Sequence, residues 1–156
     1  TIAADFIAKP LVERWRPSSD PLIKYAVDVV DDYRPGKYGF FSAHAANTFS
    51  LALYFSLWVK NRLFSFAMIS WSLLNCYSRI YLGAHYPSDV VVGLLVGAVI
   101  AVLFYLLSRK LFFKISSNFN YVSTQYSATG YSVTDIDMVL TVIGFLYILI
   151  IIIPLL

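Results

Sequence analysis

Cysteine and charged residues are both scarce in this chain of 156 residues. Cys76 is the only cysteine, which excludes an intrachain disulfide and a metal cluster held by several thiolates. Charged residues make up only 13% of the sequence, and the net charge of +3 is too small and too dispersed to indicate nucleic-acid binding. The N-terminus also lacks the basic start, apolar core and small-residue cleavage site of a signal peptide. The sequence is therefore neither a disulfide scaffold nor typical of a nucleic-acid-binding protein.

Apolar residues are abundant instead. They account for 59% of the chain, with 12 Tyr and 12 Phe, and this composition suits a lipid bilayer better than water. Four segments approach the roughly 20 residues that a helix needs to cross the hydrocarbon core. They cover residues 42–59, 63–83, 90–107 and 138–156. In the third segment Gly93 and Gly97 form a small-xxx-small pair, which predicts close packing within the bundle. The sequence predicts an all-α integral membrane helical bundle with four spans.

Less apolar stretches divide this bundle. Residues 2–8 are typical of the end of a helix, which predicts that further spans precede Thr1. Residues 112–137 are rich in Ser, Thr, Asn and Tyr, as in a surface connector or a short interfacial helix. We therefore expect three parts: a membrane core over residues 1–110, a polar connector over 111–137 and an additional transmembrane helix over 138–156.

The basic residues between the apolar segments predict an orientation. The loops that follow the first and third segments carry basic residues without an acidic one, namely Lys60, Arg62, Arg109, Lys110 and Lys114. Loops with this bias face the cytoplasm. The loops on the other side, residues 5–37 and 79–89, therefore face outward, and they mix acidic with basic residues.

Polar side chains from three separate stretches collect on that outward side. They are Lys9 and Arg16 just beyond the first helix, Ser42 and His44 at the start of the next one, and Arg79, His85 and Asp89 between the following two. Taken singly, a Lys or Arg near a span end commonly extends to the interface, and a single His there commonly forms a hydrogen bond. Their convergence on one face favours a reactive site, because charged residues at a membrane are costly.

The residue types indicate phosphate chemistry. Arg16 and Arg79 offer planar guanidinium groups suited to bidentate phosphate binding, and Lys9 offers a further positive charge. Ser42 stands where a helix N-cap is expected, and the free N–H groups of a helix start also bind anions. The small side chain of Ala43 lets an anion approach the backbone there. Together these groups predict an anion-binding site.

Two histidines divide the remaining chemistry. If a helix starts near residues 86–87, Asp89 can reach one ring nitrogen of His85 and leave the other free to attack phosphorus. His85 is therefore the candidate nucleophile. His44 is the candidate general acid that protonates the leaving oxygen and then activates water to break the phosphohistidine. This scheme requires no metal or other cofactor.

The motifs resemble those of a known family. Lys9, six residues and Arg16-Pro17, then Ser42-Ala43-His44, then Ser78-Arg79, five residues, His85, three residues and Asp89 are similar to the three-part signature of the type 2 phosphatidic acid phosphatase superfamily. That superfamily also contains bacterial acid phosphatases and vanadium haloperoxidases. Its second part is usually Pro-Ser-Gly-His, whereas this chain has Phe41 and Ala43 at the first and third places.

The resemblance extends from Lys9 to about Leu107 and has several implications. It implies phosphate binding by Lys9, Arg16, Arg79 and Ser42 with its neighbouring backbone, acid catalysis by His44, nucleophilic attack by His85, and Asp89 as the partner of His85. It implies a six-span helical bundle in which the first motif follows the third span, so that about two and a half spans precede Thr1. The segment from Met138 is additional to that arrangement.

The function expected from the residues and the resemblance is metal-independent hydrolysis of a terminal phosphate from a lipid phosphate. Undecaprenyl diphosphate is the first expected substrate, followed by phosphatidylglycerophosphate, phosphatidic acid and the phosphates of lipid A. We expect a multi-pass protein of the bacterial inner membrane with its site facing the periplasm or the outside. Its expected partners are the bilayer and the lipid phosphate, not nucleic acid, and the sequence carries no indication of an oligomeric state.

Three alternatives are open at this point. A haloperoxidase would hold vanadate in the same site, although those relatives are soluble and four apolar segments argue against this alternative. A phosphotransferase would pass the phosphoryl group from the histidine to another lipid or sugar. A lipid-binding membrane scaffold is the non-enzymatic alternative, and it is expected to have lost His44, His85 or Asp89, all of which are present.

Overall fold

The computed structural model describes residues 3–30, 33–115 and 130–153, and this part of the chain is helical, with no β-strand. A π-helix over Ala3–Ala8 continues into α1, and a 3-10 turn covers Pro17–Ser19. The helices are α1 (Lys9–Val12), α2 (Ala43–Val59), α3 (Arg62–Tyr81), α4 (Pro87–Ile115) and α5 (Val133–Ile152). The prediction of an all-α fold is confirmed. Most of the predicted polar connector, residues 111–137, lies outside the described residues, but its predicted bounds are wrong, since 111–115 belong to α4 and 133–137 to α5.

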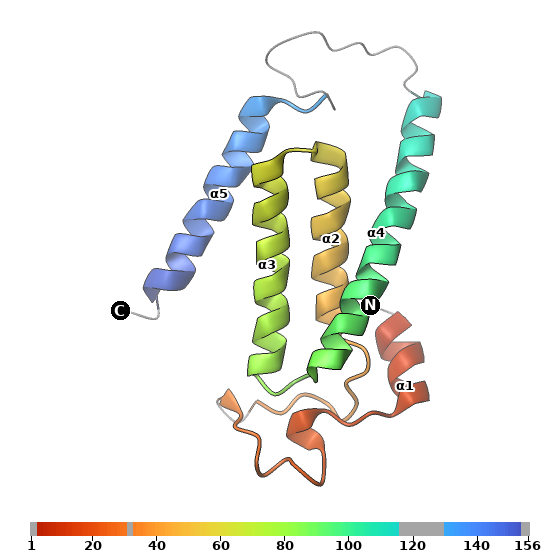
Figure 1. The fold of residues 1–156 in the computed structure, drawn as a ribbon, viewed down its shortest axis with the longest axis vertical. Coiled ribbons are helices and arrows are strands. Elements are labelled where there is room, and N and C mark those ends of the chain that lie inside the picture. The colour runs from red at the N-terminus through yellow and green to blue at the C-terminus, as the bar shows by residue number, and fades with distance from the viewer. Residues whose placement is uncertain (1–2, 31–32, 116–129, 154–156) are drawn as a thin grey trace.

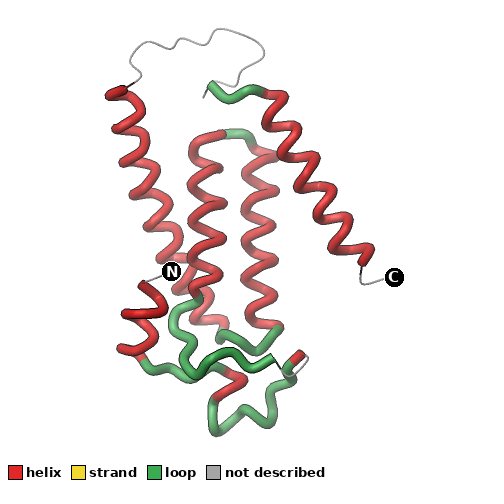
Figure 2. Tube along the Cα trace, turned by 180° about the vertical axis from the view of Figure 1, so that it is seen from behind, coloured by secondary structure: helices red, strands yellow, loops and turns green. Residues whose placement is uncertain are grey.

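Helix α2 forms the centre of the bundle. It packs against α4 and α3, and α5 contacts the bundle through α3 (Figure 1). Three clusters of buried side chains hold these contacts, and small residues such as Ala45, Ala46 and Ala52 are fully buried along α2. The long loop before α2 and the α3–α4 connection lie at the same end of the bundle, as the view from behind also shows (Figure 2). Segments far apart in the sequence therefore meet at that end.

Helices occupy all four predicted apolar segments, but they differ in their ability to cross a membrane. Residues 87–111 of α4 and all of α5 are long and apolar enough to do so. With 17 residues, α2 is about 26 Å long, shorter than the hydrocarbon core of about 30 Å. Helix α3 has 20 residues but carries Ser70, Ser72 and Asn75 along its length. Among these four helices α2 is thus the shortest and α3 the most polar, and α2, α3 and α4 all carry motif residues at the loop end of the bundle.

The first helix is longer than predicted. The sequence places its end at Ala8, with Lys9 beyond it, and this prediction is wrong. The helical backbone continues through Val12 and ends at Glu13, which has a positive φ of 47° and donates its N–H to the Lys9 carbonyl. Lys9 therefore projects from a helix and not from a loop.

The contact between α2 and α4 depends on two glycines. A Cβ at Gly93 would lie 2.6 Å from the Ser42 carbonyl oxygen, and one at Gly97 would lie 2.6 Å from the Ala46 carbonyl oxygen. Both distances are below van der Waals contact, so the backbones approach as closely as only glycine allows. The prediction that these glycines mediate packing within the bundle is confirmed. Their contact also brings the start of α2, with Ser42 and His44, close to the start of α4.

Replacement of Gly97 by alanine is therefore expected to destabilise the protein by about 1–3 kcal/mol, the usual cost of forcing an extra carbon into a packed site. Gly144 in α5 provides the matched control, because nothing lies within 4 Å of a Cβ placed there. Gly144→Ala should leave the stability unchanged or raise it slightly. Thermal unfolding of both variants in the same detergent tests this expectation, and equal midpoints for the two would contradict the packing.

Candidate functional site

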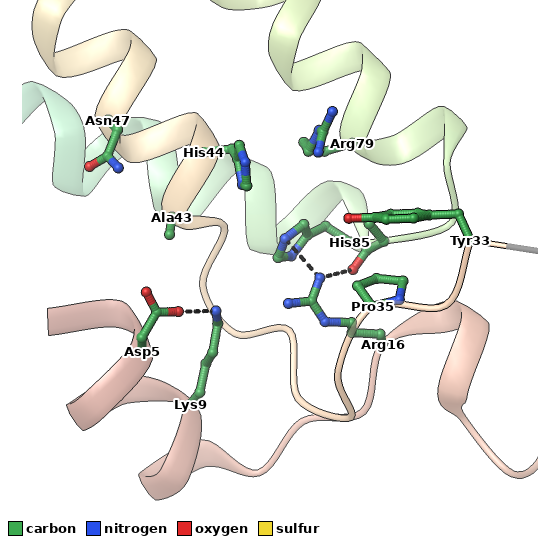
Figure 3. A pocket seen from close by; sticks show the side chains of 11 residues that line it. Asp5, Lys9, Arg16, Tyr33, Pro35, Ala43, His44, Asn47, Arg79 and His85 are labelled. Carbon is green, nitrogen blue, oxygen red and sulfur yellow. Dashed lines mark hydrogen bonds and ion pairs between the residues drawn. The ribbon is translucent and has the colours of Figure 1, made fainter. Parts of the chain in front are cut away.

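A cavity of about 200 Å³ lies at the loop end of the bundle. Figure 3 shows side chains from α1, α2, α3 and two loops directed towards it. Its lining consists of Asp5, Lys9, Arg16, Tyr33, Pro35, Ala43, His44, Asn47, Arg79, Ala84 and His85. Six of the eight residues predicted for the site are in this set. The other two, Ser42 and Asp89, are fully buried behind the cavity wall and do not line it.

Ser42 has the predicted N-cap geometry. Its backbone is extended, and its hydroxyl oxygen accepts a hydrogen bond from the Ala45 N–H at 3.4 Å. The Ser42 N–H donates to the Asp89 carbonyl oxygen at 3.0 Å, which ties the start of α2 to the start of α4. The hydroxyl of Ser42 is thus engaged in capping, while the cavity wall at this point is Ala43. In the first turn of α2 the Ala45 N–H is bound by this hydroxyl, which leaves the N–H groups of Ala43 and His44 as the anion donors there.

Arg16 holds the loops of the site together. Its Nε donates to the Tyr38 carbonyl oxygen at 3.1 Å, and one Nη donates to the Ala84 carbonyl oxygen at 3.1 Å. The same Nη lies 3.3 Å from His85 Nε2 (Figure 3). Because a guanidinium can only donate hydrogen bonds, this contact makes Nε2 the acceptor. His85 is then neutral, and its proton is on Nδ1.

The other side of His85 faces Asp89, although the two side chains do not form a hydrogen bond. His85 Nδ1 lies 4.0 Å from Asp89 Oδ2, which is an electrostatic contact longer than a hydrogen bond. The predicted helix start is confirmed, since α4 begins at Pro87, and the Tyr86 N–H donates to Asp89 Oδ2 at 3.1 Å. Gly39 packs against the side chains of Arg16, His85 and Asp89. A Cβ there would lie 3.0 Å from Arg16 Cγ, so a larger residue would press on the arginine.

Burial keeps His85 uncharged. Its side chain is 3% exposed, and this desolvation, with the nearby Arg16 cation, lowers its pKa from 6.5 to about 3, although the backbone of Gly39 acts in the opposite direction. Desolvation and a like charge both disfavour an imidazolium. At neutral pH His85 therefore has the unprotonated nitrogen that a nucleophile requires.

The low pKa of His85 predicts acid sensitivity. In the unfolded chain this histidine titrates near its ordinary pKa of about 6.5. Between that value and about 3 the unfolded state binds a proton that the folded state does not, so stability falls as the pH falls. We expect His85 to contribute a loss of about 2 kcal/mol between pH 7 and pH 4.5. Chemical denaturation of the wild type and of His85→Gln at both pH values measures this effect. The free energy of unfolding should fall less in the variant than in the wild type, and equal losses would contradict the prediction.

The remaining predicted ligands reach the cavity from opposite sides. Lys9, on α1, forms an ion pair with Asp5 one turn earlier. Arg79 lies in the last turn of α3, and its Nε donates a hydrogen bond to the Ser78 hydroxyl oxygen at 3.2 Å. His44 lies in the first turn of α2 and is exposed to the cavity. In Figure 3 His44, Arg79 and His85 point into a common space from three elements. The cavity thus combines cations with two imidazoles.

The prediction from the sequence did not include several residues of the site. Asp5, Tyr33, Pro35 and Asn47 line the cavity, and Arg14 donates to Asp89 Oδ1 at 2.8 Å. Helical spacing could have indicated Asn47, because it follows His44 by three residues on the same helix face. No sequence pattern connects Arg14 with Asp89. In the described ranges, no group of three or more His, Cys, Asp or Glu is arranged to hold a metal ion.

Comparison with known proteins places the chain in a family of phosphatases. The chain belongs to the PAP2 superfamily, which matches residues 1–113. It is 40% identical over 111 residues to a lipid A 4'-phosphatase of Bacteroides thetaiotaomicron, covering 70% of this chain and 49% of that protein. It is 41% identical over 92 residues to a lipid A 4'-phosphatase of Porphyromonas gingivalis, and the match covers 59% of this chain and 39% of that protein. It is also 36% identical over 64 residues to the undecaprenyl-diphosphatase BcrC of Bacillus subtilis, and this match covers 41% of this chain and 33% of that protein.

The chain spans half or less of the length of these relatives. No solved structure gives a significant match. The family match confirms the resemblance that the three motifs indicate, and it includes all of the residues that line the cavity.

Proposed function

We propose that this protein is a membrane lipid phosphatase that removes a terminal phosphate through a phosphohistidine on His85, without a metal. The observation that carries the proposal is the arrangement around that side chain. At the cavity, His85 Nε2 accepts a hydrogen bond from Arg16 Nη1 at 3.3 Å. On the other side of the ring, Nδ1 lies 4.0 Å from the buried carboxylate of Asp89. Nε2 therefore carries a lone pair at the cavity, which binds Arg16 until a phosphate displaces that contact and which nucleophilic attack then uses.

The proposed reaction has two steps. His85 Nε2 attacks phosphorus, the bond from phosphorus to the lipid oxygen breaks, and protonated His44 gives its proton to that oxygen. His44, now neutral, then takes a proton from water. The resulting hydroxide attacks phosphorus, the P–N bond breaks, and inorganic phosphate leaves with His44 protonated again. Lys9, Arg16 and Arg79 neutralise the charge on the equatorial oxygens in both transition states.

Lipid A phosphate is the substrate that we propose first. The sequence alone places undecaprenyl diphosphate ahead, but the two relatives named lipid A 4'-phosphatase match longer stretches at higher identity than the undecaprenyl-diphosphatase does. Undecaprenyl diphosphate is therefore the second candidate. Both are lipids with a terminal phosphoryl group, and the cavity residues described above contact only that group in the proposed reaction.

We further propose that the site faces the periplasm from the bacterial inner membrane. The cavity lies at the end of the bundle opposite the α2–α3 connection, where Lys60 and Arg62 lie, and opposite the far end of α4, which carries Arg109 and Lys110 (Figure 1). A concentration of basic residues favours the cytoplasmic side. The opposite end, with the cavity, is then outside.

Phosphate release by the full-length protein in detergent, with a metal chelator present, tests this function. We expect release from lipid A to be faster than from undecaprenyl diphosphate or phosphatidylglycerophosphate, and to be insensitive to the chelator. Faster release from undecaprenyl diphosphate would reverse the choice of substrate. Phosphate that appears on an added lipid or sugar acceptor would identify a transferase, and the absence of both reactions from the folded protein would refute the proposal.

A further inference from the structure

Asp89 is a buried carboxylate whose two oxygens have different neighbours. Its side chain is 0% exposed. Oδ1 accepts a hydrogen bond from Arg14 Nη1 at 2.8 Å. Oδ2 accepts the Tyr86 N–H at 3.1 Å and lies 4.0 Å from His85 Nδ1. The oxygen that faces the histidine is thus not the one that binds the arginine, and the carboxylate links the two residues.

Arg14 itself lies outside the cavity. The Nη1 that binds Asp89 also donates to the Ser88 hydroxyl at 2.9 Å, and the guanidinium carbon lies 4.6 Å from the ring centre of Tyr86. The Tyr86 hydroxyl is in turn fixed by donating to Asp20 at 3.1 Å. These contacts hold the guanidinium beside the first turn of α4, and Arg14 is absent from the cavity lining. Its contact with the site therefore runs through Asp89.

The charges around Asp89 explain why this contact matters. The charged and titratable groups that face its carboxylate are Arg14 and Arg16 from the N-terminal segment and His85 and Tyr86 from the α3–α4 connection. Arg16 directs its hydrogen bonds to backbone carbonyls and to His85, so Arg14 is the cation in direct contact with the carboxylate. A buried carboxylate that loses its cation is left with an uncompensated charge, which is strongly unfavourable.

We propose that Arg14 is a positioning residue of the phosphatase reaction: it keeps the Asp89 carboxylate ionised and oriented, so that His85 holds its proton on Nδ1 and presents Nε2 to phosphorus. This inference rests on the proposed function. The imidazole ring gains positive charge when Nε2 attacks, and a carboxylate beside it stabilises that charge only while it is ionised. The contribution of Arg14 therefore falls on the chemical step and not on phosphate binding.

Arg14→Gln and Arg14→Lys, compared in the full-length protein, test this role. We expect Arg14→Gln to lower kcat by about tenfold to a hundredfold, the size of effect seen when an outer partner that orients a metal-bound histidine or carboxylate is removed. KM and inhibition by orthovanadate, a phosphate analogue, should not change. Arg14→Lys should restore most of kcat, because both hydrogen bonds come from one nitrogen that an ammonium can replace. Lys24→Gln, which removes a loop cation stacked on Tyr25, is the control and should behave as wild type.

Three results would overturn the proposal. The first is full activity of Arg14→Gln. The second is a loss that Arg14→Lys does not recover although it unfolds at the wild-type temperature. The third is a parallel weakening of vanadate inhibition, which would place Arg14 among the phosphate ligands. If Arg14→Gln does not fold, Arg14→Lys decides alone, and a loss in its kcat of about tenfold or more counts against the proposal. Absence of phosphate release from the wild type would instead refute the proposed function.

Discussion

His85→Ala should abolish phosphate release from every lipid phosphate, with a loss of about 10³-fold or more, as is usual when a catalytic nucleophile is removed. The variant lacks the atom that forms the bond to phosphorus, and the other imidazole of the described cavity, His44, comes from a different element, α2 (Figure 3). Phosphate release at saturating substrate measures the loss. Lys24→Ala, which changes a loop residue outside the cavity, should retain wild-type activity.

The same variant tests the covalent intermediate. Wild-type protein mixed with a substrate labelled in its terminal phosphate and denatured rapidly in alkali should retain label, and acid should release it, because P–N bonds are stable in base and labile in acid. The His85→Ala variant should retain none. Label that persists in His85→Ala would place the nucleophile elsewhere, and a wild-type turnover without labelled protein would favour direct attack by water.

His44→Asn should show the second large effect, a loss of about 10²–10⁴-fold on a lipid phosphate. An alkoxide is a poor leaving group, and in the proposed reaction the first step depends on the proton that His44 supplies. Asparagine keeps the polar character and approximate size of the side chain but cannot donate a proton in this way. The measurement is kcat on the lipid substrate, with the unfolding temperature of the variant as the control for its fold.

A substrate with a good leaving group separates the two roles of His44. With p-nitrophenyl phosphate the leaving group needs no proton, so His44→Asn should release nitrophenol in a rapid burst equivalent to the protein present. Later turnover should be slow, because the same histidine is needed to activate water against the phosphohistidine. An equal loss on both substrates without a burst would contradict the acid role and indicate that His44 only binds phosphate.

The cavity cations are already engaged before a phosphate binds. Lys9 forms an ion pair with Asp5, and Arg16 donates to His85. The ion pair compensates the charge of Lys9 at the edge of a bilayer, where an uncompensated cation is costly. In the proposed reaction a phosphate would replace Asp5 as the partner of Lys9 and release His85 Nε2 from Arg16 for attack. The proposed site is therefore held in order by its own residues.

Much of the site could be predicted because its determinants are local. The capping hydroxyl of Ser42, the start of α4 at Pro87 and the four-residue spacing from His85 to Asp89 are properties of short stretches. The sequence also predicts that Ser42 and Asp89 belong to the site, but it does not indicate how deeply they are buried. Both are fully buried, because α2 and α4 approach closely enough for the Ser42 N–H to bond the Asp89 carbonyl.

The sequence by itself determined that the chain is a membrane helical bundle, where its long helices lie, and which family its motifs belong to, because apolar runs and motif spacing are read along the chain. Only the tertiary structure decided that Arg14, 75 residues away, binds Asp89, and that Asp5 and Asn47 line the cavity. These contacts depend on how the N-terminal segment folds against the ends of α2 and α4. That arrangement follows from packing between distant segments, and such packing leaves no periodic pattern in the sequence.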